Sequence, residues 1–408
     1  MLYILKYIMK WKCFVLLQGL VALSAFSLDL TVSRISVTGV ETTDSAVVQA
    51  AFVEVEVGDT LSIEQLTEAA ERAQSRLISW GIFGSVEVLL IPSTSKPGTA
   101  ALVATVSEGF PFRFGGGPIW GRFGVANLAG QGKNAQVWLG INKQALAYTD
   151  LVPGWRGGQW TVEAGNRPRS WFDATGKKQD WQAVGGVASL SQDWGWGWET
   201  GLAAELNALT DAAYRGAVLE ALPTISLAWS RLTPGFSPEH GVLVRAEELG
   251  SVLDGWVRSR GDARAYLPLG AGFKTAFRVT GAVQTGGYAA RDALLLSGLD
   301  GVRKAFDASD RGWANLWTSA ELRWVATPSG ILGLNVFWEP ALFFDAGLAW
   351  DQQRTPLVWA GGLALRLFLT APVFLPLRLE GSLDNQNRFQ LSFGASAPFK
   401  TRWNRSLL

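Results

Sequence analysis

The sequence offers few side chains that could carry out covalent chemistry. Its only histidine, His240, stands in a loop rich in proline, serine and glycine, a setting typical of a solvent-facing residue. Serine and aspartate are plentiful, but no base completes a nucleophilic triad. No metal-ligand cluster or phosphate-binding loop is present. We therefore predict that the protein is not an enzyme and needs no cofactor or metal.

Charged residues recur instead as single side chains within alternating apolar runs. Side chains of a strand alternate between its two faces. In Ala341–Asp351, Phe344 and Trp350 share the apolar face, and Asp345 lies on the other face among small residues. Similar alternation surrounds Glu321, Arg323, Arg366, Arg378 and Glu380. The pattern is typical of a wall with lipid on one side and water on the other, although a soluble β-sandwich also alternates.

The composition favours the membrane interpretation. Of 408 residues, 48% are hydrophobic and only 17% are charged, below the ~25% usual for soluble domains. Beyond the N-terminus, no run approaches the ~20 apolar residues of a spanning helix. Of the 20 tryptophans, all but Trp11 and Trp80 follow residue 110, as expected for aromatic girdles at the two membrane interfaces. The net charge of +1 does not indicate a nucleic-acid partner.

The N-terminus has the three parts of a signal peptide. Three lysines precede an apolar run, Cys13–Phe26, and the small residues Ala25 and Ser27 are placed for cleavage before Leu28. We predict that residues 1–27 are removed; the alternative is a retained membrane anchor. Because Cys13 is the only cysteine, the mature chain would contain no thiol.

Residues 28–109 predict a small α+β domain, which we call the head. A β-prone run ends at Gly39, and Asp44 can cap a short helix. Ser62 and Gln65 form a capping box for a longer helix that stops at Gly81. Its expected core face consists of Ile63, Leu66, Ala70, Ala73, Leu77 and Trp80. Two alternating strands follow, which gives the order strand, helix, helix, strand, strand.

Residues 110–399 predict a barrel built from short strands with turn residues between them. We count seventeen strand signals between residues 112 and 397. The signal at 332–338 is expected to be continuous with a neighbour, which restores the even number typical of bacterial barrels. The predicted fold is therefore an all-β transmembrane barrel of sixteen antiparallel strands behind an α+β head. Residues 400–408 form a C-terminal tail.

Several motifs resemble those of one family in order and spacing. The start of the head, Val32–Gly39, and the segment after its long helix, Trp80–Val88, resemble a POTRA domain. Asn127–Gly132 resembles the early Asn-Leu-x-Gly-x-Gly turn of the BamA/TamA superfamily of outer-membrane assembly and transport proteins. Gly298–Arg323 is similar to that family's inward loop and following strand, and Phe344–Gly347 to the next strand.

The resemblance implies a contact between the inward loop and the inner wall. The family's loop tip reads Val-Arg-Gly-Phe/Tyr; here it reads Val-Arg-Lys-Ala-Phe, from Val302 to Phe306. Arg303 is therefore expected to meet wall carboxylates, and alternation places Glu321 and Asp345 on that wall. A guanidinium suits carboxylates because it gives paired, charge-assisted hydrogen bonds. The alternative is that these are unrelated lumen charges.

The first and last strands are expected to meet at a seam. The first strand contains Gly115, Gly116 and Gly117 followed by proline, which weakens pairing and packing. The last strand contains Phe389 and Phe393. The resemblance implies that this seam can open sideways to lipid; the alternative is that the glycines only mark a tight bend.

Together these features predict an outer-membrane protein with a periplasmic head that assists insertion or translocation of other proteins. Its expected partners are outer-membrane lipids, unfolded periplasmic client proteins and accessory subunits. The head would engage clients by strand addition, and the seam would offer a second edge. The alternatives are a dedicated secretion channel for one partner and a structural or porin-like barrel.

Overall fold

The computed structural model describes most of the predicted head and barrel. The described residues are 29–109, 111–117, 120–141, 143–151, 156–172, 178–211, 217–233, 237–286, 293–297, 301–304, 310–325, 329–331, 334–351, 356–369 and 375–394. The predicted signal peptide and C-terminal tail lie outside them. No helix within these ranges is long and apolar enough to cross a membrane.

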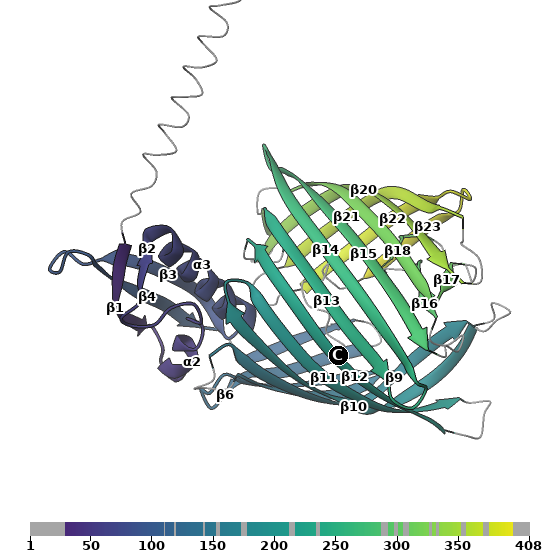
Figure 1. Ribbon diagram of the computed structural model, residues 1–408, viewed down its shortest axis with the longest axis horizontal. Helices are drawn as coiled ribbons and strands as arrows, with labels where there is room; N and C mark the ends of the chain where they lie inside the picture. The colour runs from purple at the N-terminus through teal and green to yellow at the C-terminus, as the bar shows by residue number, and fades with distance from the viewer. Residues whose placement is uncertain are drawn as a thin grey trace, which may run out of the picture.

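The head is a four-stranded sheet with helices packed on it (Figure 1). Its elements in chain order are β1 (Asp29–Thr38), α2 (Ser45–Gln49), β2 (Thr60–Ser62), α3 (Ile63–Trp80), β3 (Phe83–Pro92) and β4 (Thr99–Glu108). The sheet order is β2-β1-β4-β3, with β1 and β4 parallel. The predicted element order is correct except for β2, which has three residues and pairs with the start of β1.

Helix α3 supplies most of the head's core. The capping box of Ser62 and Gln65 is present, and Gly81 ends the helix in the left-handed conformation with φ 63°. Leu66, Ala73 and Leu77 are fully buried against the sheet. The assignment of Ile63 to the core was wrong, because this residue opens the helix and remains 42% exposed. Helical spacing alone does not show where the first turn projects beyond the sheet.

The barrel follows the head and consists of seventeen strand segments in the described residues (Figure 1). They are β5 (Phe112–Gly117), β6 (Trp120–Leu128), β7 (Lys133–Gly140), β8 (Gln144–Leu151), β9 (Gly158–Phe172), β10 (Lys178–Gly195), β11 (Trp198–Asp211), β12 (Ala217–Leu232), β13 (Gly241–Ser251), β14 (Trp256–Gly270), β15 (Phe273–Gly286), β18 (Ala314–Trp324), β19 (Ser329–Ile331), β20 (Leu334–Trp350), β21 (Val358–Leu369), β22 (Leu375–Asp384) and β23 (Phe389–Gly394). β19 has only three residues and pairs with the start of β20. Sixteen strands therefore form the wall, and residues 334–338 of the predicted segment 332–338 are part of β20.

The strand order is that of a closed barrel in which β23 is followed by β5. Antiparallel ladders of six or more residue pairs join the other neighbouring wall strands, for example β5 with β6 and β22 with β23. β23 and β5 are also hydrogen-bonded neighbours in this order, so the barrel is closed at this junction.

Side chains alternate across the wall as the sequence predicts. On β20, Ala341, Phe343 and Asp345 are buried inside, whereas Leu342 and Phe344 are 56% and 51% exposed outside. Large exposed apolar side chains recur on the same outer face of β11, β12 and β21. An outer apolar band around a charged interior is the arrangement of a transmembrane β-barrel.

Candidate functional site

The inward loop between β15 and β18 folds back against the inner wall. Two short strands, β16 (Leu294–Leu295) and β17 (Arg311–Gly312), pair at its base. The N–H of Val302 donates to the carbonyl of Leu296 at 2.8 Å, which turns the tip back on the loop. Leu296 and Val302 are fully buried in a cluster with Trp317 of β18 and Ala349 of β20. This packing places the next residue, Arg303, beside the wall carboxylates.

Arg303 binds two carboxylates that come from neighbouring strands. Its Nε donates to Asp345 Oδ2 at 2.7 Å, and its Nη2 donates to Asp345 Oδ1 at 2.8 Å. Its Nη1 donates to Glu321 Oε1 at 2.6 Å. The backbone N–H of Arg303 also donates to Asp345, at 3.0 Å. Arg303 is 8% exposed and both carboxylates are almost completely buried, so these contacts are charge-assisted hydrogen bonds in a shielded site.

Further wall residues complete the environment of Arg303. Glu380 of β22 accepts from Nη1 at 3.2 Å, and Ser319 accepts from Nη2 at 3.0 Å. The guanidinium carbon lies 3.6 Å from the centroid of the Phe343 ring, a cation–π contact. Burial alone would lower the pKa of Arg303, but the nearby carboxylates raise it above its usual value. The arginine therefore remains a cation.

A second group of wall charges holds Glu321 in place. Arg366 of β21 donates to both oxygens of Glu321, at 2.9 and 2.7 Å, and Arg323 donates to Oε2 at 2.7 Å. Glu339 accepts from Arg366 at 3.0 Å and pairs with Lys274 at 3.1 Å. The contacts cross five strands from β15 to β22. Through Glu321, the contact of the loop with the wall is therefore connected to a network of charges on β15, β18, β20, β21 and β22.

The structure brings three of the four lumen residues singled out from the sequence into one contact. Arg303, Glu321 and Asp345 meet, and Phe306 lies outside the described residues. Sequence reasoning did not name Glu380 and Arg366 as partners. Alternation in the sequence already placed both residues on the inner face. Only the strand register shows that Glu380 contacts Arg303 and that Arg366 contacts Glu321.

Lys304 occupies the position where the family's loop has glycine. Its side chain is 1% exposed and forms an ion pair with Asp310 across the loop. Its backbone N–H donates to the carbonyl of Val302 at 2.8 Å. The altered tip therefore gains an internal ion pair while Arg303 still reaches the wall.

The seam residues lie on the two strands that meet where the barrel closes. Gly115, Gly116 and Gly117 form the second half of β5. On β23, Phe389 and Phe393 are 70% and 71% exposed. β23 and β5 are hydrogen-bonded neighbours in the closed barrel, and lateral opening of the seam stays a prediction.

A second polar site, which sequence reasoning missed, joins the head to the barrel. Arg76 of α3 forms an ion pair with Glu54 of the head and donates from Nε to Asp193 of β10 at 2.7 Å. Glu54 also accepts from the N–H of Trp196 in the β10–β11 turn at 3.1 Å. Burial alone would lower the pKa of Arg76, but its bonds to both carboxylates raise it above its usual value. On the sequence, Arg76 resembles any solvent-facing helix residue.

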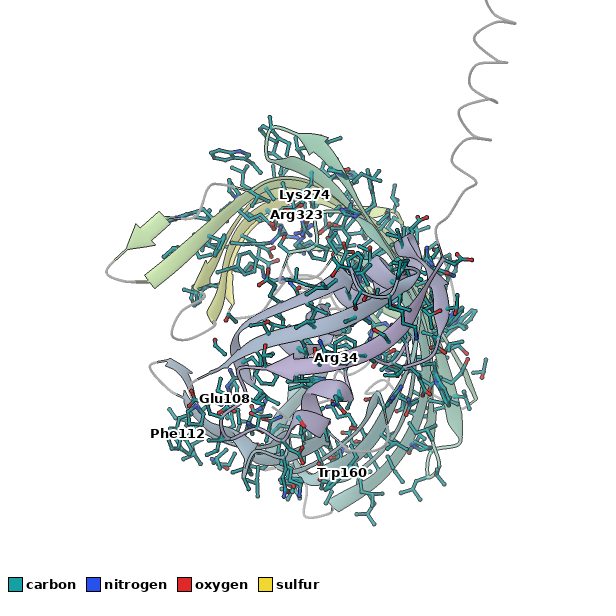
Figure 2. All side chains as sticks on the ribbon, turned by 90° about the vertical axis from the view of Figure 1, so that its left-hand side faces the viewer. Arg34, Glu108, Phe112, Trp160, Lys274 and Arg323 are labelled. Carbon is teal, nitrogen blue, oxygen red and sulfur yellow. The ribbon has the colours of Figure 1, made fainter. Side chains whose placement is uncertain are left out.

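The Asn127–Gly132 turn is another contact between head and barrel. Asn127 Nδ2 donates to Thr43 Oγ1 at 2.7 Å, and the N–H of Asp44 donates to the carbonyl of Gly130 at 2.8 Å. Gly130 has φ 71°, and a Cβ there would lie 1.9 Å from the carbonyl oxygen of Thr42. Only glycine permits this approach. The head consequently lies across one end of the barrel, as the views from the side and from that end show (Figures 1 and 2).

Comparison with known proteins identifies the head. Residues 30–109 match the POTRA family, described as a surface antigen variable number repeat. No curated protein sequence matches the chain significantly. The head is therefore a POTRA domain.

Solved structures identify the fold of the whole described chain. BamA from Haemophilus ducreyi, lacking POTRA domains 1–3, aligns over 89% of this chain and 83% of its own, with 14% identity and a TM-score of 0.52. CdiB from Acinetobacter baumannii and CdiB from Escherichia coli each share 12% identity over 90% of this chain. They are covered over 73% and 74% of their own lengths, with TM-scores of 0.58 and 0.59. At these identities the likeness concerns the fold.

Proposed function

Because the chain joins a POTRA domain to a barrel with the fold of BamA and CdiB, we propose that it inserts or translocates other proteins at the bacterial outer membrane. Its clients are unfolded periplasmic proteins, with accessory subunits as further partners. The activity is templating of strands by main-chain pairing and involves no covalent chemistry. The head lies in the periplasm, so protease added to intact cells should spare it, and ready digestion there would overturn the orientation.

The observation that carries this proposal is the open edge of the head's sheet. β3 is the last strand of the order β2-β1-β4-β3 and has ten residues. Its Leu89 and Ile91 side chains are 45% and 47% exposed. A long edge strand with exposed apolar side chains is a template for an added strand.

Gln74 of α3 occupies part of this edge. The N–H of Val88, at the middle of β3, donates to Gln74 Oε1 at 3.1 Å. This N–H is therefore not used by β4 and faces the open side of β3. An incoming client strand would replace the Gln74 amide with a backbone carbonyl, so Gln74 acts as an exchangeable cap on the edge.

The seam is the second edge that a client would use. A closed barrel has no free edge, so strand templating at the barrel requires main-chain pairing to break at one junction. The β23–β5 junction, with its run of three glycines, is the candidate with the least side-chain packing. The Arg303 contact braces β18, β20 and β22 behind it, which keeps one side of the seam in a fixed position.

The experiment compares the outer-membrane proteome of cells with and without this protein, and of cells carrying Ile91→Asp. We expect loss of the same client proteins in the deletion and in the edge variant, because a charge at the edge blocks strand addition. Ile78→Asp is the matched control, since Ile78 is also 47% exposed but lies on α3. An unchanged proteome in the deletion strain would contradict the proposal and favour a structural barrel. Loss of one secreted protein alone would favour a dedicated channel.

A further inference from the structure

The outer wall of the barrel carries an apolar groove that runs across six strands. It has a cavity volume of about 640 Å³ and extends from Trp160 on β9 to Val257 on β14. A row of small or ring-closed residues forms its floor: Ala188, Ala204, Pro223 and Gly250. The outward side chains around it, such as Leu202 and Ile225, are 54% and 55% exposed. The groove therefore opens toward lipid and not toward the lumen.

Strand register explains why the groove exists. Ala188 pairs with Ala204, and Ala204 pairs with Pro223, so short side chains stand side by side on three strands. A Cβ on Gly250 would lie 3.7 Å from the Pro223 ring, which places Gly250 next in the row. Two residues along each strand, a bulky row runs in parallel: Trp160, Leu190, Leu202 and Ile225. A row of small residues beside a row of large ones leaves a trough.

Glu248 stands at the end of the bulky row, where it pairs with Ile225 across the β12–β13 ladder. It faces outward with Val244 on β13, and the nearby Val257 on β14 is 48% exposed. Within the described residues, Glu248 makes no ion pair and no side-chain hydrogen bond. The buried lumen carboxylates Asp345 and Glu321, in contrast, both form ion pairs. Glu248 is thus a single exposed carboxylate in an apolar band.

A carboxylate on the lipid-facing side of a barrel is unfavourable, and such residues mark functional sites. The cost falls when a cation from the membrane lies beside the carboxylate. The groove itself is apolar and suits a hydrocarbon chain, which contributes ~0.8 kcal/mol per buried CH₂. Charge and shape together specify an amphipathic ligand with a cationic group at one end.

We propose that this groove binds a phospholipid, with one acyl chain along the floor of small residues and a primary ammonium headgroup paired with Glu248. The ammonium supplies three N–H donors to the carboxylate. A partner helix is the poorer fit, because six strands span ~24 Å and a helix of that length and ~10 Å diameter occupies ~1,900 Å³. That is about three times the volume of the groove. The site lies on the outer face of β9 to β14, apart from the seam strands β5 and β23, and it does not depend on the proposed function.

The test is native mass spectrometry of the full chain released from detergent with added lipid. Phosphatidylethanolamine and phosphatidylglycerol with identical acyl chains are compared, so that only the headgroup differs. We expect the wild type to retain phosphatidylethanolamine at least fivefold better than phosphatidylglycerol. Glu248→Gln should bring this ratio close to one, while Glu247→Gln, one residue earlier on the lumen face, should leave it unchanged.

A second variant tests the groove separately from the charge. Ala204→Leu fills the floor and should lower retention of both lipids several-fold while the barrel stays folded, as judged by its heat-dependent mobility on gels. Ala188→Leu serves the same purpose if the first variant does not fold. Equal retention of the two lipids by the wild type would overturn the headgroup assignment. An unchanged ratio in Glu248→Gln, or unchanged retention in a folded groove-filled variant, would overturn the site.

Discussion

Replacing Arg303 by alanine tests whether its ion pairs hold the inward loop against the wall. The substitution removes every side-chain bond to Asp345, Glu321, Glu380 and Ser319. The barrel should still fold, because Glu321 keeps its bonds to Arg366 and the wall ladders are unaffected. The expected defect is therefore local: a loop that leaves the wall more often.

The size of the effect follows from the burial of the partners. Breaking a buried ion pair costs ~3–5 kcal/mol, and breaking an exposed pair costs ~0–1 kcal/mol. Arg303 is 8% exposed, and the side chains of Glu321 and Asp345 are 0% exposed, so the buried value applies. Because Glu321 retains other cations and Asp345 retains the backbone N–H of residue 303, we take the lower end, ~3 kcal/mol. That corresponds to a ~100-fold shift in the docking equilibrium of the loop.

The assay uses Val302→Cys as a reporter, because Val302 is fully buried when the loop is docked. In a Cys13→Ser background this is the only thiol. We expect a soluble maleimide to label the reporter ~100-fold faster when Arg303→Ala is added, in proportion to the undocked population. Arg303→Lys should give an intermediate labelling rate, because lysine keeps the positive charge but lacks the planar guanidinium that can form two parallel hydrogen bonds with one carboxylate. Equal labelling rates with and without Arg303, in barrels that are equally folded, would refute the reasoning.

Three further predictions concern the head. Arg76→Ala should loosen the head from the barrel by ~3 kcal/mol, seen as broader spin-label distances between head and wall. Arg72→Ala should change these distances much less, because it loses a pair within α3 and, across to the barrel, only a 3.4 Å bond to the carbonyl of Ser230. Unchanged distances in Arg76→Ala would contradict this. Burial alone would raise the pKa of Glu108, but hydrogen bonds from Thr42 and Thr43 lower it to about 2, so its stabilisation is complete above pH ~4.5 and is lost as the pH falls toward 2. Hydrogen exchange at the Thr42 and Thr43 amides should show this acid dependence, and Glu108→Gln should abolish it. Gln74→Ala should increase binding of an unfolded client to the head several-fold, measured by fluorescence anisotropy, and weaker binding would show that Gln74 is not a cap.

The period of two in the barrel strands made much of the wall predictable from the sequence. It placed Asp345 and Glu321 on the inner face and Phe344 on the outer face, as the structure has them. It also showed that 332–338 need not be a separate strand. These conclusions depend only on which residues share a face, which the sequence states directly.

Pairings between distant residues were not predictable in the same way. The contacts of Arg303 with Glu380, and of Glu321 with Arg366, depend on strand register and on the course of the loop. Arg76 was missed because the partner that distinguishes it, Asp193, lies 117 residues away. Glu248 was missed because it interrupts the alternation with a second consecutive glutamate, and only the structure shows that it faces outward.

The most direct test of the central claim is a disulfide across the β23–β5 seam. Cysteines are placed singly in Phe112–Gly117 and in 390–395, in a Cys13→Ser background, and pairs within disulfide reach are selected by crosslinking. A control pair across β7 and β8, whose ladder has no register shift, locks a junction that should stay closed. We predict that locking the seam abolishes client insertion and that reductant restores it, while the control lock has no effect. Full activity of a completely crosslinked seam would contradict lateral opening.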